Sequence, residues 1–424
     1  MSRPRTALAR LLVCLAVGAS AALGLPARAA TAPATAPATA PATASAGTAG
    51  FTLFDNTAYA SANIGHGAVR ANLVPNYTCT PLVAGGALPD EARWKEIVAA
   101  ADVNPDAPLV LDCESLYLNG SAANAADHLN RLAQLQAWAR QVAAPGQIIG
   151  WYGLLGNTSA AYRPLYQQLI QQAGATAFFP SAYTFSANET TWSSTLAANL
   201  ATAAATAPTV PVYPYIWPQY HQGSSPDSLS LGFVPAAQWS YQLATLHDLG
   251  LRGAVVWGGS NSAVCDGACQ AAAGGQGWLP QTRAFLDWTG SGADRRDDLA
   301  RQAVVSASSV NVAGREGAKA ADGDPLTRWG SQYADPQWLS LDLGAVRPLT
   351  GARLVWETAY GTAYLLQGSV DGTTWTTLHS TDTGTGGTEL IGPFTGSARY
   401  VRLLGTARGT SYGYSLWSLN LYGD

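Results

Sequence analysis

Two acidic residues lie one position apart directly after an apolar run. Asp112 and Glu114 flank Cys113 and follow the run 109–111. Side chains alternate along a strand, so both carboxyl groups are expected on one face, about 7 Å apart along the chain. Two carboxyl groups this close cannot both ionise cheaply, so one pKa is expected to rise and provide a proton donor. Glycosidic cleavage uses such a pair, although two acids also open ordinary polar loops.

The acid pair lies in a region where short apolar runs alternate with helical stretches. This alternation predicts a parallel sheet covered by helices, and about 240 residues match a closed (β/α) TIM-type barrel of eight strands. A distorted or seven-stranded barrel is the alternative. In such a barrel the two acids belong to the mouth, where active sites lie. The expected strands cover 51–54, 109–111, 147–152, 175–183, 210–216 and 253–257, and the helices 89–101, 123–142, 159–173, 191–206 and 235–249.

Aromatic segments end the later apolar runs. They are Gly150-Trp151-Tyr152-Gly153, Phe178-Phe179-Pro180-Ser181-Ala182-Tyr183, Pro211-Val212-Tyr213-Pro214-Tyr215-Ile216-Trp217 and Val255-Val256-Trp257-Gly258. Together with the Asp-x-Glu, and in this order, they resemble the hyaluronidases, family 56 of the glycoside hydrolases. The resemblance covers roughly 109–260.

The resemblance assigns roles to individual residues. It implies that Glu114 is the general acid and that Asp112 orients the N-acetyl group of the substrate, which acts as the internal nucleophile. Tyr183 would hydrogen-bond to that group, and Trp257 would form the floor under the sugar. Tyr152 and Tyr215 are further expected substrate-binding residues. For Tyr183 and Trp257, core packing is the competing interpretation.

The net charge of this region differs from the charge expected of a groove that binds hyaluronan. Residues 51–290 hold 14 acidic residues against 8 Lys or Arg, a balance of −6. A groove for a polyanion should be basic, so we predict a neutral or weakly charged polysaccharide. Cys113 stands where the family often has an aromatic residue, and alternation points its side chain away from the mouth.

The N-terminus and the cysteines indicate export. Residues 1–29 combine early arginines, an apolar run and a small-residue cleavage site, as in a secretory signal peptide, and residues 30–50 form an Ala/Thr/Pro-rich linker expected to be disordered. Four cysteines remain after the signal: Cys79, Cys113, Cys265 and Cys269. Disulfides are therefore expected, with three possible connectivities.

The polar segment 289–298 is expected to link the barrel, 51–288, to an all-β domain, 299–424. The latter resembles the discoidin or coagulation-factor type C domain of family 32 carbohydrate-binding modules, through Ala321–Trp329, Trp338–Gly344, Ser369–Trp375 and Ala398–Arg402. The resemblance implies a jelly-roll, galactose-binding-like sandwich whose loops at one end bind sugar. The expected contacts are Glu357, Tyr360, Tyr364 and Tyr412.

The same domain contains an expected calcium site. Asp322, Asp324 and Thr327 present oxygens around a tight Gly turn, which suits a hard cation, and the resemblance implies a structural Ca²⁺ there. Ser418 stands where relatives often place an acid.

These observations predict a secreted, monomeric glycoside hydrolase held on a polysaccharide by its second domain. The alternative is a non-catalytic, lectin-like polysaccharide-binding protein. The net charge of −4 and the absence of a later bilayer-spanning stretch argue against nucleic-acid binding and membrane insertion.

Overall fold

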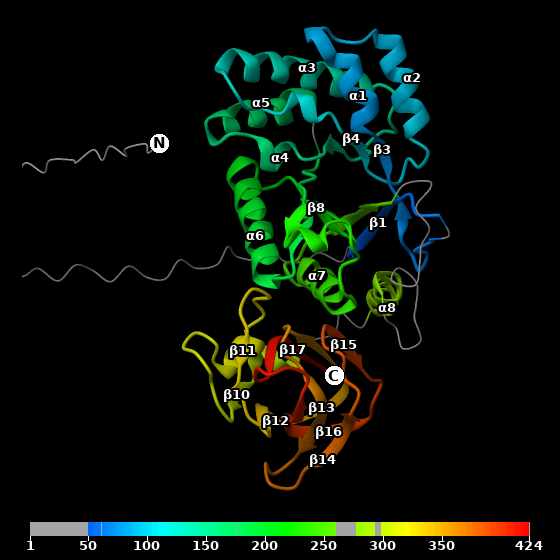
Figure 1. The fold of residues 1–424 in the computed structure, drawn as a ribbon. Helices are drawn as coiled ribbons and strands as arrows, with labels where there is room; N and C mark the ends of the chain where they lie inside the picture. The colour runs from blue at the N-terminus through cyan, green and yellow to red at the C-terminus, as the bar shows by residue number, and fades with distance from the viewer. Residues whose placement is uncertain (1–49, 61, 175, 260–276, 293–297, 424) are drawn as a thin grey trace, which may run out of the picture. The chain divides into compact units, whose positions relative to one another are not determined.

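The computed structural model describes residues 50–60, 62–174, 176–259, 277–292 and 298–423. The predicted signal peptide, almost all of the predicted linker 30–50, and Cys265 and Cys269 lie outside these ranges. Figure 1 shows an N-terminal region of mixed helices and strands and a C-terminal region made mostly of strands. No helix among the described residues is long and apolar enough to span a bilayer.

Short parallel strands form the centre of the N-terminal region. They are β1 (Thr52–Thr57), β2 (Val69–Arg70), β3 (Asn72–Val74), β4 (Leu109–Leu111), β5 (Ile149–Trp151), β6 (Thr184–Ser186), β7 (Tyr215–Ile216), β8 (Tyr220–Ser225) and β9 (Gly253–Gly258). The sheets have the orders β2-β1-β9-β7, β3-β4-β5 and β6-β8. All of these pairings are parallel.

Single parallel bridges connect the first two sheets. Tyr152 pairs with Phe179, Phe178 with Val212, and Ser181 with Tyr215. The expected strand 175–183 therefore pairs only through such bridges. With β2 and β3 separated only by Ala71, the parallel pairings run in a circuit from β1 through β4, β5 and β7 to β9, which pairs with β1 again.

The helices and the alternation of buried residues agree with the predicted pattern. The helices are α1 (Asn76–Val83), α2 (Glu91–Ala101), α3 (Ala122–Arg140), α4 (Leu154–Asn157), α5 (Arg163–Ala173), α6 (Glu189–Thr206), α7 (Ala236–Asp248) and α8 (Trp278–Gly290). In β4, Leu109 and Leu111 pack with residues of the helices, whereas Val110 packs with side chains of the other strands. Alternate residues of the strand therefore face the helices, and the residues between them face the side chains of the other strands.

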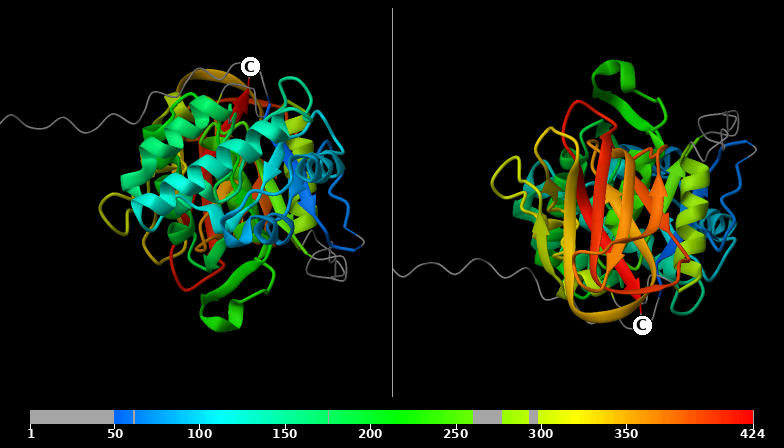
Figure 2. Two further views of the ribbon diagram at one scale, coloured as in Figure 1. Left: turned by 90° about the horizontal axis from the view of Figure 1, so that it is seen from above. Right: turned by 90° about the horizontal axis from the view of Figure 1, so that it is seen from below.

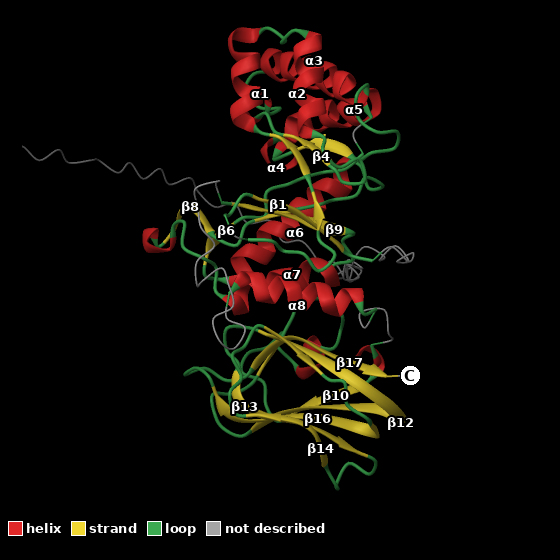
Figure 3. Ribbon diagram, turned by 90° about the vertical axis from the view of Figure 1, so that its right-hand side faces the viewer, coloured by secondary structure: helices red, strands yellow, loops and turns green. Residues whose placement is uncertain are grey.

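The C-terminal region is a β-sandwich. Its strands are β10 (Val304–Ala307), β11 (Trp329–Gly330), β12 (Gln337–Trp356), β13 (Gly361–Ser369), β14 (Thr376–Thr381), β15 (Thr388–Ile391), β16 (Gly396–Arg408) and β17 (Ser415–Gly423). The sheet order is β11-β17-β12-β16-β13-β14, with β10 and β15 also paired to β12 (Figure 3). The turn at Asp371-Gly372 connects β13 to β14, which pair antiparallel.

Candidate active site

Asp112 and Glu114 both line a cavity of about 810 Å³. Asp112 directly follows β4, and Glu114 begins the short 3₁₀ helix η2 (Glu114–Leu116). The side-chain Oδ1 of Asn76 accepts a hydrogen bond of 3.0 Å from the backbone N–H of Glu114 and fixes the turn between them. The prediction that both acids face one common space is confirmed.

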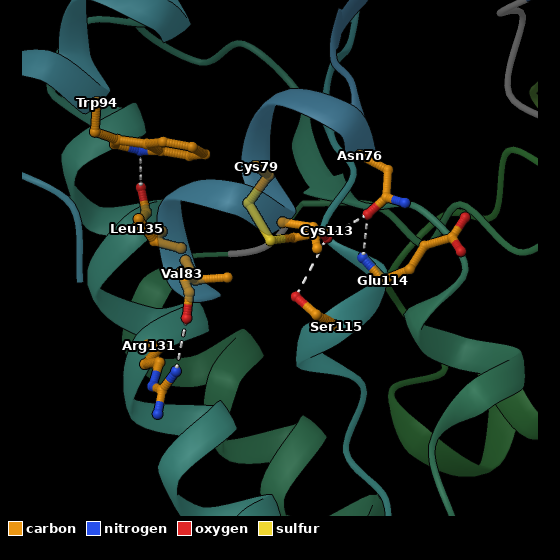
Figure 4. The surroundings of a disulfide bond; sticks show 10 residues. Asn76, Cys79, Val83, Trp94, Cys113, Glu114, Ser115, Arg131 and Leu135 are labelled. Carbon is orange, nitrogen blue, oxygen red and sulfur yellow. Dashed lines mark hydrogen bonds between the residues drawn. A yellow bond between two sulfur atoms is a disulfide. The ribbon is translucent and has the colours of Figure 1, made fainter. Parts of the chain in front are cut away.

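The cysteine between the acids lies on the other side of the chain. Cys113 forms a disulfide with Cys79 of α1 and is buried among helix residues. Figure 4 shows the Glu114 side chain extending away from this disulfide. Cys79 thus pairs with Cys113, as in one of the three expected connectivities. This disulfide covalently links α1 to the segment that carries both acids.

The raised pKa that was expected of the proton donor is found for Asp112, whereas the resemblance makes Glu114 the general acid. Burial, with the nearby Glu114 carboxylate, raises the pKa of Asp112 to about 7, although a hydrogen bond from the backbone of Asn76 lowers it. Asp112 Oδ1 is buried and has no hydrogen-bond partner among the described residues. Asp112 therefore carries a proton up to near-neutral pH. The two acids also differ in exposure, since Asp112 is half-buried and Glu114 is exposed.

Three tyrosines surround the buried acid. Tyr152, Tyr183 and Tyr215 line the same cavity, with the Tyr152 ring 4.9 Å from that of Tyr215 and 6.1 Å from that of Tyr183. Burial raises the pKa of Tyr152 to about 12 and the pKa of Tyr183 well above its ordinary value. All three phenols are therefore neutral at physiological pH, and the hydroxyls of Tyr183 and Tyr152 hydrogen-bond to each other.

Two tryptophans form the next part of the wall. The Trp257 ring lies 4.8 Å from that of Trp217 and 5.8 Å from that of Tyr183. Gly258 has φ of +146°, and a Cβ there would lie 2.5 Å from the Trp217 ring, so only glycine lets this ring approach. Such flat apolar rings beside polar groups match the two sides of a sugar ring.

Every residue predicted for this site lines the cavity, and several lining residues were missed. Asn56, Asn76, Trp217 and His221 also line it. Trp217 had a usable signal, because it stands two positions after Tyr215 and so shares its face of the strand. Asn76 follows β3 and His221 lies within β8, and the apolar pattern predicted neither strand.

In the C-terminal domain three of the four predicted sugar contacts make contacts within the domain itself. Tyr364 is only 1% exposed, and its hydroxyl hydrogen-bonds to Glu389. Tyr360 packs its ring over Gly386 and Gly409. Glu357 is paired with Arg328 at 2.5 Å. The prediction for Tyr364 was wrong, because an aromatic residue near a turn is as easily buried in the core as exposed, whereas Tyr360 and Glu357 stay predictions.

Tyr412 is the predicted contact that remains available. Its side chain is 57% exposed, and its ring lies 5.7 Å from that of Tyr333, which is 54% exposed. Arg408 donates a hydrogen bond of 3.2 Å to the backbone carbonyl of Tyr412, and Arg408 and the hydroxyl of Tyr414 both donate to Asp335, at 3.1 and 2.5 Å. Two exposed neighbouring rings on a hydrogen-bonded loop are suited to stacking on a ligand.

The predicted calcium loop brings oxygen atoms together. The hydroxyl of Thr327 lies 2.9 Å from an Asp322 carboxylate oxygen and 3.2 Å from the backbone carbonyls of Lys319 and Asp324. The oxygens of this loop fit a hard cation. The Lys319 ammonium lies 3.4 Å from Asp322 and would compete with that cation. The side chain of Asp324 instead accepts the N–H of Leu326.

The sequence of the C-terminal region matches a known domain family. Residues 304–419 match the model of the F5/8 type C domain, so the C-terminal region is a discoidin-like domain of this kind. No curated protein matches the chain.

Solved structures resemble the same region. Chitosan-binding module 1 of a chitosanase/glucanase from Paenibacillus sp. IK-5 is 44% identical over 30% of this chain and 99% of its own, with a TM-score of 0.29. Module 2 of that enzyme, solved with chitotriose, is 44% identical over 30% of this chain and 100% of its own, with a TM-score of 0.29. A Clostridium perfringens module, CpGH89CBM32-5, solved with GalNAc-β-1,3-galactose, is 21% identical over 30% and 100% of the two chains, with a TM-score of 0.28.

Proposed function

We propose that this chain is a secreted glycoside hydrolase that cleaves a neutral or weakly charged polysaccharide by acid-assisted hydrolysis. The observation that carries the proposal is the pairing of Asp112 and Glu114 in one cavity walled by aromatic rings. The circuit of parallel strands is proposed to be a (β/α) barrel, since its acids follow the carboxyl end of β4, where barrel enzymes carry their catalytic groups.

The two acids have different surroundings and therefore different proposed roles. Glu114 is exposed in the cavity, so its carboxyl group is the one that a glycosidic oxygen can reach as the general acid. Asp112 lies among tyrosines and holds a proton near neutral pH, which lets it donate a hydrogen bond to a substituent of the bound sugar. Tyr183 is the proposed donor beside it.

The F5/8 type C domain is proposed to bind the same polysaccharide. The pair of exposed rings, Tyr333 and Tyr412, supports this role because sugar faces stack on such rings. Binding a polymer through a second site keeps the cavity close to its substrate and raises the local concentration. Export is proposed from the signal-like residues 1–29, and the Cys79–Cys113 disulfide supports an oxidising compartment.

The proposal is tested by replacing Glu114 with Gln, which keeps the size of the side chain and removes its proton. Reducing ends released from a panel of soluble and insoluble polysaccharides, chitosan, chitin and β-glucans among them, are measured for the wild type and the variant. We expect a fall of about 10²–10⁴-fold on whichever polymer the wild type cleaves, as for other general acids. Polysaccharide pull-down should be unchanged.

The matched control is Glu96→Gln, an exposed glutamate of α2 that does not line the cavity. It should keep full activity. Hydrolysis that survives Glu114→Gln would refute the assignment of the acid. A wild type that binds polymers and hydrolyses none would instead establish a polysaccharide-binding protein without this activity.

A further inference from the structure

An exposed aromatic side chain continues the wall of the cavity. Tyr183 lines the cavity, and Phe185 stands two positions later in β6. Alternation along extended chain puts both side chains on the same face, about 7 Å apart. Phe185 is 47% exposed, although a phenylalanine ring gains free energy from burial.

A ring from the neighbouring strand joins these two side chains. His221 of β8 lines the cavity and stacks on Tyr183, with 5.7 Å between ring centres and 21° between planes. The ring of Phe185 lies 4.5 Å from that of His221. Trp217 lies 6.0 Å from His221 on the inner side. The rings thus form a continuous row from the floor of the cavity to the exposed face of Phe185.

The strands that carry this row are firmly attached to α7. Tyr220 donates a hydrogen bond of 2.7 Å to Gln238, and Gln242 donates one of 2.8 Å to Thr184. Gln238 also donates to the backbone carbonyl of Ser186 at 3.1 Å. Figures 2 and 3 show β8 and the short helix η4 (Asp227–Leu229) standing out from the rest of the N-terminal region. The row of rings is therefore held in place before any ligand binds.

The cavity is also bordered by an exposed ring on another element. Tyr77, near the start of α1, lines the cavity and is 82% exposed. It neighbours Asn76, which holds the backbone of Glu114. Aromatic side chains thus extend from the acids along two separate elements, β6 and α1. A pocket for a single terminal sugar needs no exposed platform outside the cavity.

We propose that Phe185 and His221 form a distal subsite that stacks on an uncharged sugar unit of the polysaccharide, so that the acids act on internal linkages of the chain. This inference rests on the proposed hydrolase function and adds its mode of attack and substrate class: a linear polysaccharide whose sugars present apolar faces. The platform itself is made of rings, and neither Phe185 nor His221 makes an ion pair among the described residues.

The test compares Phe185→Ala with the wild type, both as full chains. Leu231→Ala is the matched control, because Leu231 is 49% exposed and apolar, follows η4 closely, and does not line the cavity. Two readouts are used: the KM and product lengths of hydrolysis, and retardation of the proteins in gels containing glycol chitin, hydroxyethyl cellulose or laminarin. Retardation does not depend on hydrolysis.

Phe185→Ala should raise KM about fivefold to tenfold on the cleaved polymer, as expected for the loss of one stacking ring. Cleavage of its shortest hydrolysed oligosaccharide should change much less, and Leu231→Ala should match the wild type throughout. If no polymer is hydrolysed, the proposed function fails, and weaker retardation of Phe185→Ala still supports the subsite. Equal retardation of Phe185→Ala and wild type, or no retardation of either, overturns it.

Discussion

Two carboxyl groups, Asp112 in the N-terminal region and Asp342 in the F5/8 type C domain, have opposite surroundings. Asp112 is half-buried, its Oδ1 is buried with no hydrogen-bond partner among the described residues, and its pKa is raised to about 7. In the F5/8 type C domain Asp342 receives two hydrogen bonds from Arg399, at 2.8 and 3.0 Å. Those bonds, with the backbone N–H of Gly344, hold the pKa of Asp342 below its ordinary value.

This difference separates a group kept for chemistry from one kept for structure. A paired carboxylate is stable and unreactive, whereas a buried one without a full set of partners costs free energy. Perturbed acids in a cavity are enriched at catalytic sites for this reason, although structural networks also perturb pKa values. Burial also raises the pKa of Glu389 in the C-terminal domain, but Glu389 does not line the cavity that Asp112 and Glu114 share. The raised pKa together with the position in the cavity therefore supports placing the proposed chemistry at Asp112 and Glu114.

The change Asp112→Asn tests the role of the half-buried acid. Asn keeps the shape of the side chain but cannot ionise. Activity on the cleaved polymer should fall about 10²-fold or more, because the acid that faces the bound sugar is lost. The free energy of unfolding should instead be higher for Asp112→Asn than for the wild type at high pH. The reason is that the wild type must either keep a proton on Asp112 or bury a negative charge.

The sign follows from the direction of the shift. A raised pKa means that the contribution of Asp112 to stability is fully present below 3.8, its unfolded value, and is lost as pH rises through about 7. The free energy of unfolding of Asp112→Asn should thus exceed that of the wild type by about 1–4 kcal/mol at pH 8, with the excess shrinking toward pH 4. Urea unfolding at both pH values measures this. An excess that is the same at pH 4 and pH 8 would contradict the raised pKa.

The candidate site was predictable where local periodicity decides the geometry. Alternation after an apolar strand placed Asp112 and Glu114 on the cavity side and Cys113 on the helix side, because a strand has only two faces. The helices α2, α3, α6 and α7 begin and end within about two residues of their expected limits. Asn76 was missed because β3 has only three residues and its sequence, Asn72-Leu73-Val74, does not stand out as an apolar run.

The ligand contacts of the C-terminal domain were predictable only in part. The domain family was predictable because its turns and strands carry characteristic residues over most of its length, and the match to residues 304–419 confirms it. Which aromatic residues are displayed depends on tertiary packing. Tyr364 and Tyr412 are the same residue type, yet one lies in the core and the other on a loop.

That contrast can be sharpened by two tyrosine variants. Tyr412→Ala should weaken polysaccharide pull-down about tenfold and leave thermal unfolding unchanged, because the ring is exposed. Tyr364→Phe should do the reverse: it removes a buried hydroxyl that donates to Glu389 and should cost about 1–3 kcal/mol of stability with binding intact. A Tyr364→Phe protein with wild-type stability and impaired binding would show that Tyr364 contacts the ligand and does not stabilise the core.

Calcium is expected to stabilise the F5/8 type C domain. Asp322, Thr327 and the carbonyls of Lys319 and Asp324 can hold the ion, which would raise stability by about 2.7 kcal/mol at a hundredfold excess over its Kd. Affinity should be modest, because Ser418 adds no negative charge and Lys319 must give up its contact with Asp322. The midpoint of thermal unfolding should therefore fall by a few degrees when EDTA replaces millimolar Ca²⁺, and Asp322→Asn should abolish that difference. A wild-type midpoint that is the same in both buffers would contradict a structural Ca²⁺ at this loop.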